Sequence, residues 1–247
     1  MTDALQSVIL AAGKGTRMRS DRPKVLHELS GRPLLAWVLD AARGAGSRRQ
    51  VVVVGHQADR VRAAVSGDDL AFVLQEPQLG TGHAVQCAAS ALRPDGWTLV
   101  LAGDVPLLRA DTLRALATAA RDAGAAAVVL TAVVDDAGAY GRIVKDAAGR
   151  LQRIVEARDA TPAELAIGEY NTGVFCFRTP DLLAVLDRLD TDNDQGEYYL
   201  TDTIELLVRD GRPVATLTVD DPAETVGINT VAELAAAQRL LDSRGGK

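Results

Sequence analysis

Short apolar runs alternate with amphipathic segments along the first half of the chain. Segments with one apolar face predict helices over 33–46, 58–66, 84–92 and 111–123. The apolar runs around them are typical of buried strands, namely "SVIL", "VVVVG", "AFVLQ", "WTLVLAGD" and "AAAVVLTAVV". Strands that alternate with helices in this way predict βαβ units. Because the strands are apolar on both faces, we expect an α/β fold with a mostly parallel, doubly wound sheet.

The rhythm changes after Val134. Residues 141–157 alternate apolar and polar positions around Gly149, which predicts an antiparallel hairpin. The remaining segments predict a strand over 169–177, helices over 180–189 and 198–211, a strand over 213–219 and a helix over 230–241. Thr230 and Glu233 have the spacing of a capping box at the start of that last helix.

No repeat or low-complexity linker marks a domain boundary. We therefore interpret residues 1–241 as one domain with an added antiparallel hairpin lobe. Its parts are a first lobe over about 1–134, a hairpin lobe over about 135–229 and a closing helix over 230–241, with a polar tail over 242–247.

Composition narrows the class of protein. The 247 residues are 47% hydrophobic and 24% charged, which suits a globular protein with a sizeable core. Cys87 and Cys176 form no metal-ligand or C-x-x-C spacing, so buried thiols in a reducing compartment are expected. The net charge of −6 argues against nucleic-acid binding. Without a targeting or membrane-spanning pattern, the sequence predicts a cytoplasmic protein with no membrane partner, and it gives no prediction of self-association.

The glycine-rich segment "LAAGKGTRM" (10–18) follows the first predicted strand, where α/β proteins bind phosphates. The dinucleotide fingerprint would need glycine at Met18, and Lys14 and Thr16 are not spaced as in a P-loop. What remains is a flexible basic loop that contains Arg17 and is followed by Lys24. An ordinary strand-to-helix turn with solvated basic residues is the alternative.

Gln75 ends another predicted strand and leads into "EPQLGTGHA". Its amide carries both a donor and acceptors and could read the edge of a base, as could Gln78. Gly80 and Gly82 would allow a ligand to approach the backbone closely. The alternative is a glycine-containing turn that starts a helix, with His83 in its first turn.

Asp104 closes an almost wholly apolar strand, where a carboxylate is costly to desolvate unless it meets a cation or donors. A hard divalent ion such as Mg²⁺ would suit it, and a helix N-cap is the alternative. Asn229 could also be a cap, but Thr230 already supplies one, which leaves the Asn229 side chain for a ligand. The histidines do not cluster and no covalent nucleophile stands out, so direct phosphoryl or nucleotidyl transfer is favoured.

Taken together, these motifs resemble those of bacterial N-acetylglucosamine-1-phosphate uridylyltransferases. The segments that carry the resemblance occur in that family's order: "LAAGKGTRM", "PKVLH", "QLGTGHA", "GDVPL", "YGRIV", "IVE", "NTGV", "QGEYYLTD" and "GIN". They are similar to the N-terminal domain of the bifunctional enzyme that makes UDP-N-acetylglucosamine. The resemblance implies a Rossmann-like nucleotidyltransferase fold. It also implies UTP and N-acetylglucosamine-1-phosphate as substrates, Mg²⁺ as cofactor and a role in cell-wall precursor synthesis.

By this resemblance, the residues divide into four sets. Arg17, Lys24 and Asp104 are expected to be catalytic, with Asp104 and Asn229 holding the metal. The nucleotide-binding set is Leu10, Ala11, Ala12, Gly13, Lys24, Gln75, Gly80 and Thr81. The sugar-binding set is Ala102, Gly103, Gly141, Glu156, Asn171 and Asn229. Ala102 stands where some members of the family carry a tyrosine, so a contact from that side chain is not expected here.

One departure from the family's pattern is large. The bifunctional enzymes continue into hexapeptide repeats that carry acetyltransferase activity, and no such repeat occurs in these residues, so acetyl transfer is not expected of them. The rival functions are the same reaction with another sugar or base, and a non-catalytic nucleotide-sugar sensor. A nicotinamide-dependent oxidoreductase is disfavoured because Met18 breaks the fingerprint.

Overall fold

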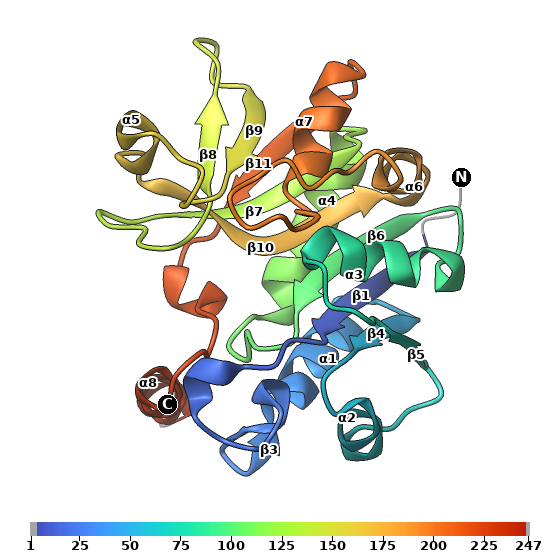
Figure 1. Ribbon diagram of the computed structural model, residues 1–247, viewed down its shortest axis with the longest axis vertical. Helices are drawn as coiled ribbons and strands as arrows, with labels where there is room; N and C mark the ends of the chain where they lie inside the picture. Colours follow the sequence, from blue (N-terminus) through green and yellow to red (C-terminus); the bar gives the residue numbers. More distant parts are fainter. Residues whose placement is uncertain (1–3, 246–247) are drawn as a thin grey trace.

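The computed structural model describes residues 4–245, and nine of the strands in that range form one sheet. Seven of them follow the order β11-β7-β10-β6-β1-β4-β5 (Figure 1). Strand β1 pairs in parallel with β4 and β6, β4 with β5, and β7 with β11, while β10 runs antiparallel between β6 and β7. The bounds are β1 Leu5–Ala11, β4 Gln50–Val54, β5 Leu70–Leu74, β6 Trp97–Ala102, β7 Ala127–Val133, β10 Glu169–Arg178 and β11 Val214–Thr218. The expected mostly parallel α/β sheet is confirmed.

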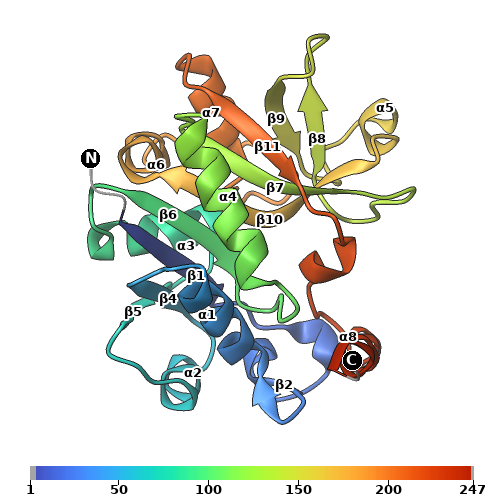
Figure 2. The ribbon, with the colours of Figure 1, turned by 180° about the vertical axis from the view of Figure 1, so that it is seen from behind.

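Helices cover both faces of this sheet. Side chains alternate between the faces along each strand, so that these apolar strands present an apolar surface on both sides. On β1, Ile9 enters the core cluster beneath one helical layer and its neighbour Val8 enters the cluster on the opposite face. The first layer, seen from behind in Figure 2, contains α1 (Leu34–Gly44), α2 (Ala58–Ala64) and α4 (Ala110–Asp122). The second contains α3 (Thr81–Ala88), α6 (Thr179–Leu186) and α7 (Asp202–Arg209).

The predicted hairpin is present as β8 (Arg142–Lys145) and β9 (Leu151–Val155). Gly149 occupies the turn at φ +78°, a backbone region that favours glycine. The hairpin joins the main sheet where Arg142 pairs with Tyr170 of β10. The short helix α5 (Pro162–Leu165) lies between β9 and β10 and was not predicted.

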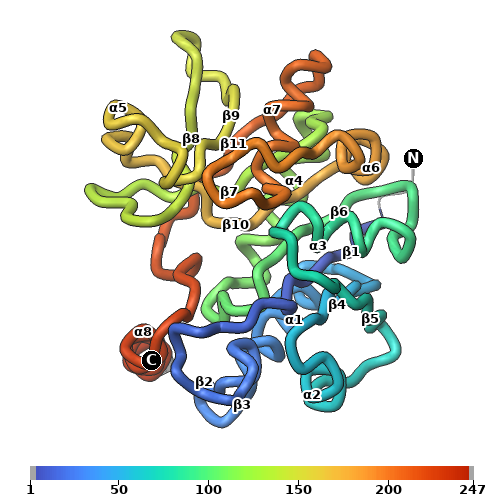
Figure 3. Tube along the Cα trace, viewed as in Figure 1, coloured from blue at the N-terminus to red at the C-terminus, as the bar shows by residue number. Residues whose placement is uncertain are grey.

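The last helix closes the fold against its beginning (Figure 3). Helix α8 spans Val231–Gly245, so residues 242–245 continue the helix rather than form the expected tail, while 246–247 lie outside the described residues. It packs on an apolar cluster that includes Leu29 and Leu34, at the small hairpin of β2 (Glu28–Leu29) and β3 (Arg32–Pro33). No helix within residues 4–245 is long and apolar enough to cross a membrane.

Candidate active site

The carboxyl ends of the parallel strands β1, β6, β4 and β5 lie along one edge of the sheet, where open α/β sheets bind ligands. The glycine-rich loop follows β1, Gln75 follows β5 and Asp104 comes two residues after β6. The topology therefore brings together three of the strand ends that the sequence predicts as functional.

A cluster of two cations and two oxygen ligands forms at this edge. Lys24, in the 3₁₀ turn η2 (Lys24–Leu26), makes an ion pair with the nearly buried Asp104. Its Nζ also donates to Asn229 Oδ1 at 3.1 Å, and Arg17 Nη2 donates to the same oxygen at 2.8 Å. Arg17 lies in the turn η1 (Thr16–Met18), so the cluster joins the opening loop, β6 and the start of α8.

Asn229 is available for these contacts because it does not cap α8. Thr230 Oγ1 accepts from the Glu233 backbone N–H at 3.2 Å, and Glu233 Oε2 accepts from the N–H of Thr230 at 2.8 Å and of Asn229 at 2.6 Å. The predicted capping box is thus confirmed. The Ile228 N–H donates to the Asp104 carbonyl at 2.9 Å, which holds the Asn229 segment beside β6.

The side-chain oxygens of Asp104 and Asn229 both contact one cation, the Lys24 ammonium. A carboxylate and an amide oxygen are hard ligands of the kind that Mg²⁺ prefers. No group of three or more His, Cys, Asp or Glu side chains in residues 4–245 could hold a metal ion. The two oxygen donors of Asp104 and Asn229 fit a magnesium ion, because Mg²⁺ is commonly held by one or two protein oxygens and takes its remaining ligands from water and substrate phosphates.

Gln75 organises the second glycine-containing segment. Its backbone N–H donates to Val54 at the end of β4, and its Nε2 donates to the Gly80 carbonyl at 2.9 Å. Gln75 lines a cavity of about 400 Å³ together with Lys14 of the opening loop. The residue is thus placed where a base could meet it, next to the basic loop.

Gly80 and Gly82 are needed for a reason that the sequence did not show. A Cβ at Gly80 would lie 2.6 Å from the Tyr198 carbonyl oxygen, and one at Gly82 would lie 2.9 Å from it. The two glycines thus allow the Tyr198 backbone to approach closely, and the approach of a ligand to this segment stays a prediction. Tyr198 N–H donates to Leu79 at 2.8 Å, so the prediction of a helix from residue 198 is wrong and α7 begins only at Asp202.

A second cavity, of about 230 Å³, gathers most of the predicted sugar-binding residues from both lobes. Its walls are largely apolar, and its polar groups include Glu156, Asn171 and Thr201. The predicted residues that line it are Leu10, Thr81, Ala102, Gly141, Glu156 and Asn171. Thr81, expected beside the base, thus lies on this cavity and not on the one lined by Gln75.

Glu156 and Asn171 are held by specific contacts. Thr201 Oγ1 donates to Glu156 Oε1 at 3.1 Å, and burial raises the pKa of the Glu156 carboxyl above its usual value. Asn171 lies at an irregularity of β10, where the register against β7 shifts before Val174. Its Oδ1 accepts from the Gly173 N–H at 3.0 Å, and its Nδ2 makes no hydrogen bond within the described part of the chain.

Gly141 and Gly103 lie where neighbouring atoms leave little room for a side chain. A Cβ at Gly141 would lie 3.1 Å from Ile154 and 3.4 Å from Glu156 Oε2. Gly103 donates its N–H to the Leu10 carbonyl at 2.9 Å, next to the cation cluster. Gly13 has no neighbour within 4 Å of an added Cβ, and Ala11 and Ala12 are buried beneath the loop.

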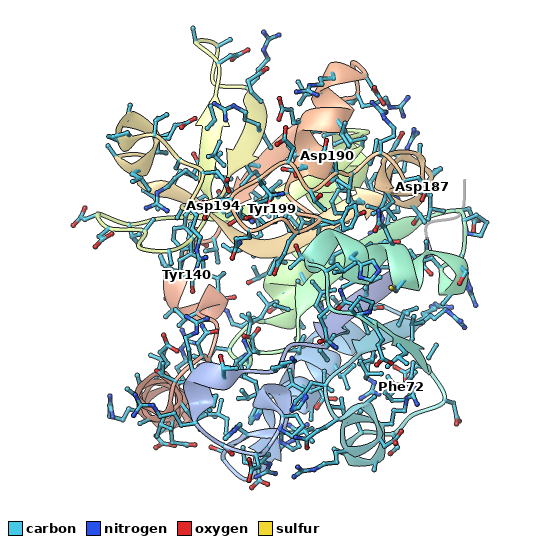
Figure 4. The ribbon with its side chains drawn as sticks, viewed as in Figure 1. Phe72, Tyr140, Asp187, Asp190, Asp194 and Tyr199 are labelled. Carbon is cyan, nitrogen blue, oxygen red and sulfur yellow. The ribbon has the colours of Figure 1, made fainter. Side chains whose placement is uncertain are left out.

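Sequence reasoning missed two tyrosines. The rings of Tyr140 and Tyr170 contact each other in a tilted arrangement, with centroids 4.6 Å apart and planes 33° apart. The Tyr140 hydroxyl accepts from the Gly227 N–H at 3.5 Å. Figure 4 shows Tyr140 at the junction between the hairpin lobe and the segment that leads to α8. Each tyrosine directly precedes a predicted sugar-binding residue, Gly141 or Asn171, and that adjacency was the available signal.

The fold and this edge of the sheet are those of a nucleotidyltransferase, with a basic glycine-rich loop, an acidic residue after β6 and a lobe added beside them. The chain belongs to the family of MobA-like NTP transferase domains, which matches residues 7–207.

Relatives and solved structures agree with this assignment. The chain is 54% identical over 233 residues to the bifunctional protein GlmU of Burkholderia thailandensis, and equally to those of Burkholderia mallei and Burkholderia pseudomallei. The match covers 94% of this chain, which spans about half the length (51%) of these curated relatives.

Two solved structures share the fold at low sequence identity. A UDP-glucose pyrophosphorylase complexed with UDP-glucose aligns with a TM-score of 0.76 at 16% identity, over 98% of this chain and 99% of that one. A Bacillus anthracis protein assigned as a glucose-1-phosphate thymidylyltransferase, in complex with a sucrose, aligns with a TM-score of 0.77 at 20% identity. The alignment covers 96% of this chain and 95% of that one.

Proposed function

We propose that this chain transfers UMP from UTP to N-acetylglucosamine-1-phosphate, releasing pyrophosphate and UDP-N-acetylglucosamine. The observation that carries the proposal is the position of the Lys24–Asp104–Asn229–Arg17 cluster beside the 230 Å³ cavity. Ala102 lines that cavity two residues before Asp104. Charged groups suited to phosphates therefore adjoin a cavity whose few polar groups, Glu156 and Asn171 among them, are suited to a sugar. The identity to GlmU relatives supports the same reaction.

The residues are suited to in-line transfer without a general base. A phosphate oxygen of the sugar phosphate is already anionic, so it attacks the α-phosphorus of UTP directly. The bond to the bridging oxygen breaks, and pyrophosphate leaves with the electron pair. Lys24 and Arg17 neutralise the charge on the α-phosphate and the leaving group, which is catalysis by positioning and electrostatics.

We further propose Mg²⁺ as the cofactor, held by the two predicted metal ligands, Asp104 and Asn229. When bound, the ion supplies positive charge to the phosphate oxygens. Glu156 and Asn171 bind the acetamido sugar, and Gln75 binds uracil. The proposed setting is the cytoplasm, with the product used in peptidoglycan synthesis.

A substrate panel tests this function. Pyrophosphate release is measured for UTP, CTP, ATP, GTP and dTTP against N-acetylglucosamine-1-phosphate, glucose-1-phosphate and galactose-1-phosphate, with and without EDTA. We expect the highest kcat/KM for UTP with N-acetylglucosamine-1-phosphate and no turnover in EDTA. Faster turnover of another pair would overturn the assignment, and binding of UDP-N-acetylglucosamine without turnover in Mg²⁺ would identify a sensor.

A further inference from the structure

Two acceptors hold the amide nitrogen of Gln75. Its Nε2 lies 2.9 Å from the Gly80 carbonyl oxygen and 3.2 Å from His83 Nδ1. His83 lies in the first turn of α3, one turn before Cys87, whose Sγ is 3.6 Å from His83 Nε2. The imidazole thus lies between the Gln75 amide and Cys87.

These contacts determine which atom of the amide is left over. A backbone carbonyl only accepts hydrogen bonds, so the Gln75 atom that faces Gly80 is the NH₂ group. His83 Nδ1 accepts the second amide hydrogen only when it is unprotonated, which places the imidazole proton on Nε2, toward Cys87. Both amide hydrogens are then used. Oε1 makes no hydrogen bond within residues 4–245 and remains as the acceptor.

We propose that His83 is a positioning residue for base selection. By holding the Gln75 amide with Oε1 toward the nucleotide, it makes the site select bases that present an N3–H group. Uracil and thymine carry that donor, whereas the N3 of cytosine is an acceptor and would face Oε1 with like polarity. A reversed amide would present its NH₂ group instead and would favour cytosine.

The position of Gln75 supports this assignment. Gln75 is almost wholly buried, and it lines the 400 Å³ cavity beside Lys14. A buried polar contact of this kind discriminates strongly, because the wrong base leaves a desolvated group unpaired. The role of the cavity in nucleotide binding rests on the proposed function, but the orientation of the amide rests only on Gly80 and His83.

The test compares variants that keep or remove the acceptor at the Nδ1 position. His83→Phe keeps a ring without an acceptor, and His83→Ala replaces it if the larger ring prevents folding. His83→Asn restores an acceptor oxygen near the place of Nδ1. Cys87→Ala, on the far side of the imidazole, is the control. For each protein, kcat and KM are measured for UTP and for CTP, and the dissociation constants of both nucleotides are measured without the sugar phosphate.

We expect His83→Phe to lower the UTP-to-CTP ratio of kcat/KM and of affinity about fivefold to tenfold, the effect of one hydrogen bond. The change in His83→Phe should lie in KM, with kcat nearly constant. His83→Asn should restore the UTP-to-CTP ratio to within about twofold of the wild type. Cys87→Ala should leave that ratio unchanged. An unchanged ratio in His83→Phe or His83→Ala overturns the inference. If the wild type binds UTP over CTP but does not turn UTP over, the proposed function fails, and the affinity ratios still decide the role of His83.

Discussion

The side chain of Lys24 packs directly onto the backbone of Gly15. A Cβ at Gly15 would collide with the Lys24 Cβ and would lie 3.2 Å from its Cγ. Gly15 also adopts φ +62°, a conformation that L side chains rarely take. The glycine-rich loop and the η2 turn therefore fit together as one unit, and this glycine serves the placement of Lys24.

Gly15→Ala should displace Lys24 and lower kcat/KM about a hundredfold, because a shift of about 1 Å in a charged group costs that much. The strained φ should also lower the melting temperature by a few degrees. Gly31→Ala is the control, since Gly31 has φ +73° but nothing within 4 Å of an added Cβ. If both variants keep wild-type kinetics, the fit between Gly15 and Lys24 has no catalytic consequence.

Lys24→Ala and Asp104→Ala should each lower kcat about a hundredfold to a thousandfold, which corresponds to about 2.7–4 kcal/mol. Each variant removes one side of the ion pair at the proposed phosphate site. Lys145→Ala breaks a comparable pair, with Glu169 at 2.6 Å, in the hairpin lobe and should leave turnover unchanged. Circular dichroism checks that all three fold. Near-normal turnover of either site variant would remove its assigned role.

The part of the site that follows from parallel strand ends could be predicted from the sequence. Leu10, Gln75 and Asp104 each follow or close an apolar run, and parallel strands place such ends on one edge. The fold class and the β8–β9 hairpin could be predicted for the same reason, since apolar periodicity and a turn glycine are local signals.

What depends on long-range pairing could not be predicted. The contact of Thr201 with Glu156 exists because residues 198–200 bond to the loop at 79–82 instead of forming a helix. The amphipathic pattern over 198–211 does not indicate that its first residues bond to a distant loop and not to the helix. The ring contact between Tyr140 and Tyr170 likewise requires the register of β8 against β10, which no local pattern determines.

Glu233→Ala should loosen the Asn229 segment, because the Glu233 carboxylate accepts from the backbone N–H of both Asn229 and Thr230. We expect a loss of about 1 kcal/mol in the free energy of unfolding. Activity should also need a higher Mg²⁺ concentration for half-maximal rate. Glu164→Ala removes the equivalent carboxylate from the capping box of α5, at Thr161. It should cost similar stability with an unchanged Mg²⁺ requirement, and equal Mg²⁺ curves for both variants would contradict the role of Glu233.

Asp202→Asn should stabilise the protein at neutral pH. Burial, together with the negative charges of Asp190 and Glu205, raises the pKa of Asp202 from 3.8 to about 6. The folded state therefore binds a proton more tightly than the unfolded state. The resulting stabilisation is fully present below about pH 3.8 and is lost as pH rises through about 6. Asparagine carries no charge at any of these pH values. The melting temperature of the variant should therefore be several degrees higher than that of the wild type at pH 7.5 and equal to it at pH 3.5.

Asp210→Asn should change the melting temperature in the opposite direction and serves as the control. Arg188 lowers the pKa of the exposed Asp210 carboxyl, so that this group stabilises the fold above its unfolded pKa and the effect is lost as pH falls. Its replacement should lower the melting temperature slightly at pH 7.5 and have no effect at low pH. Melting curves of the two variants and the wild type between pH 3.5 and 8 measure both differences. A pH-independent difference for Asp202→Asn would show that burial of the Asp202 charge is not the cause.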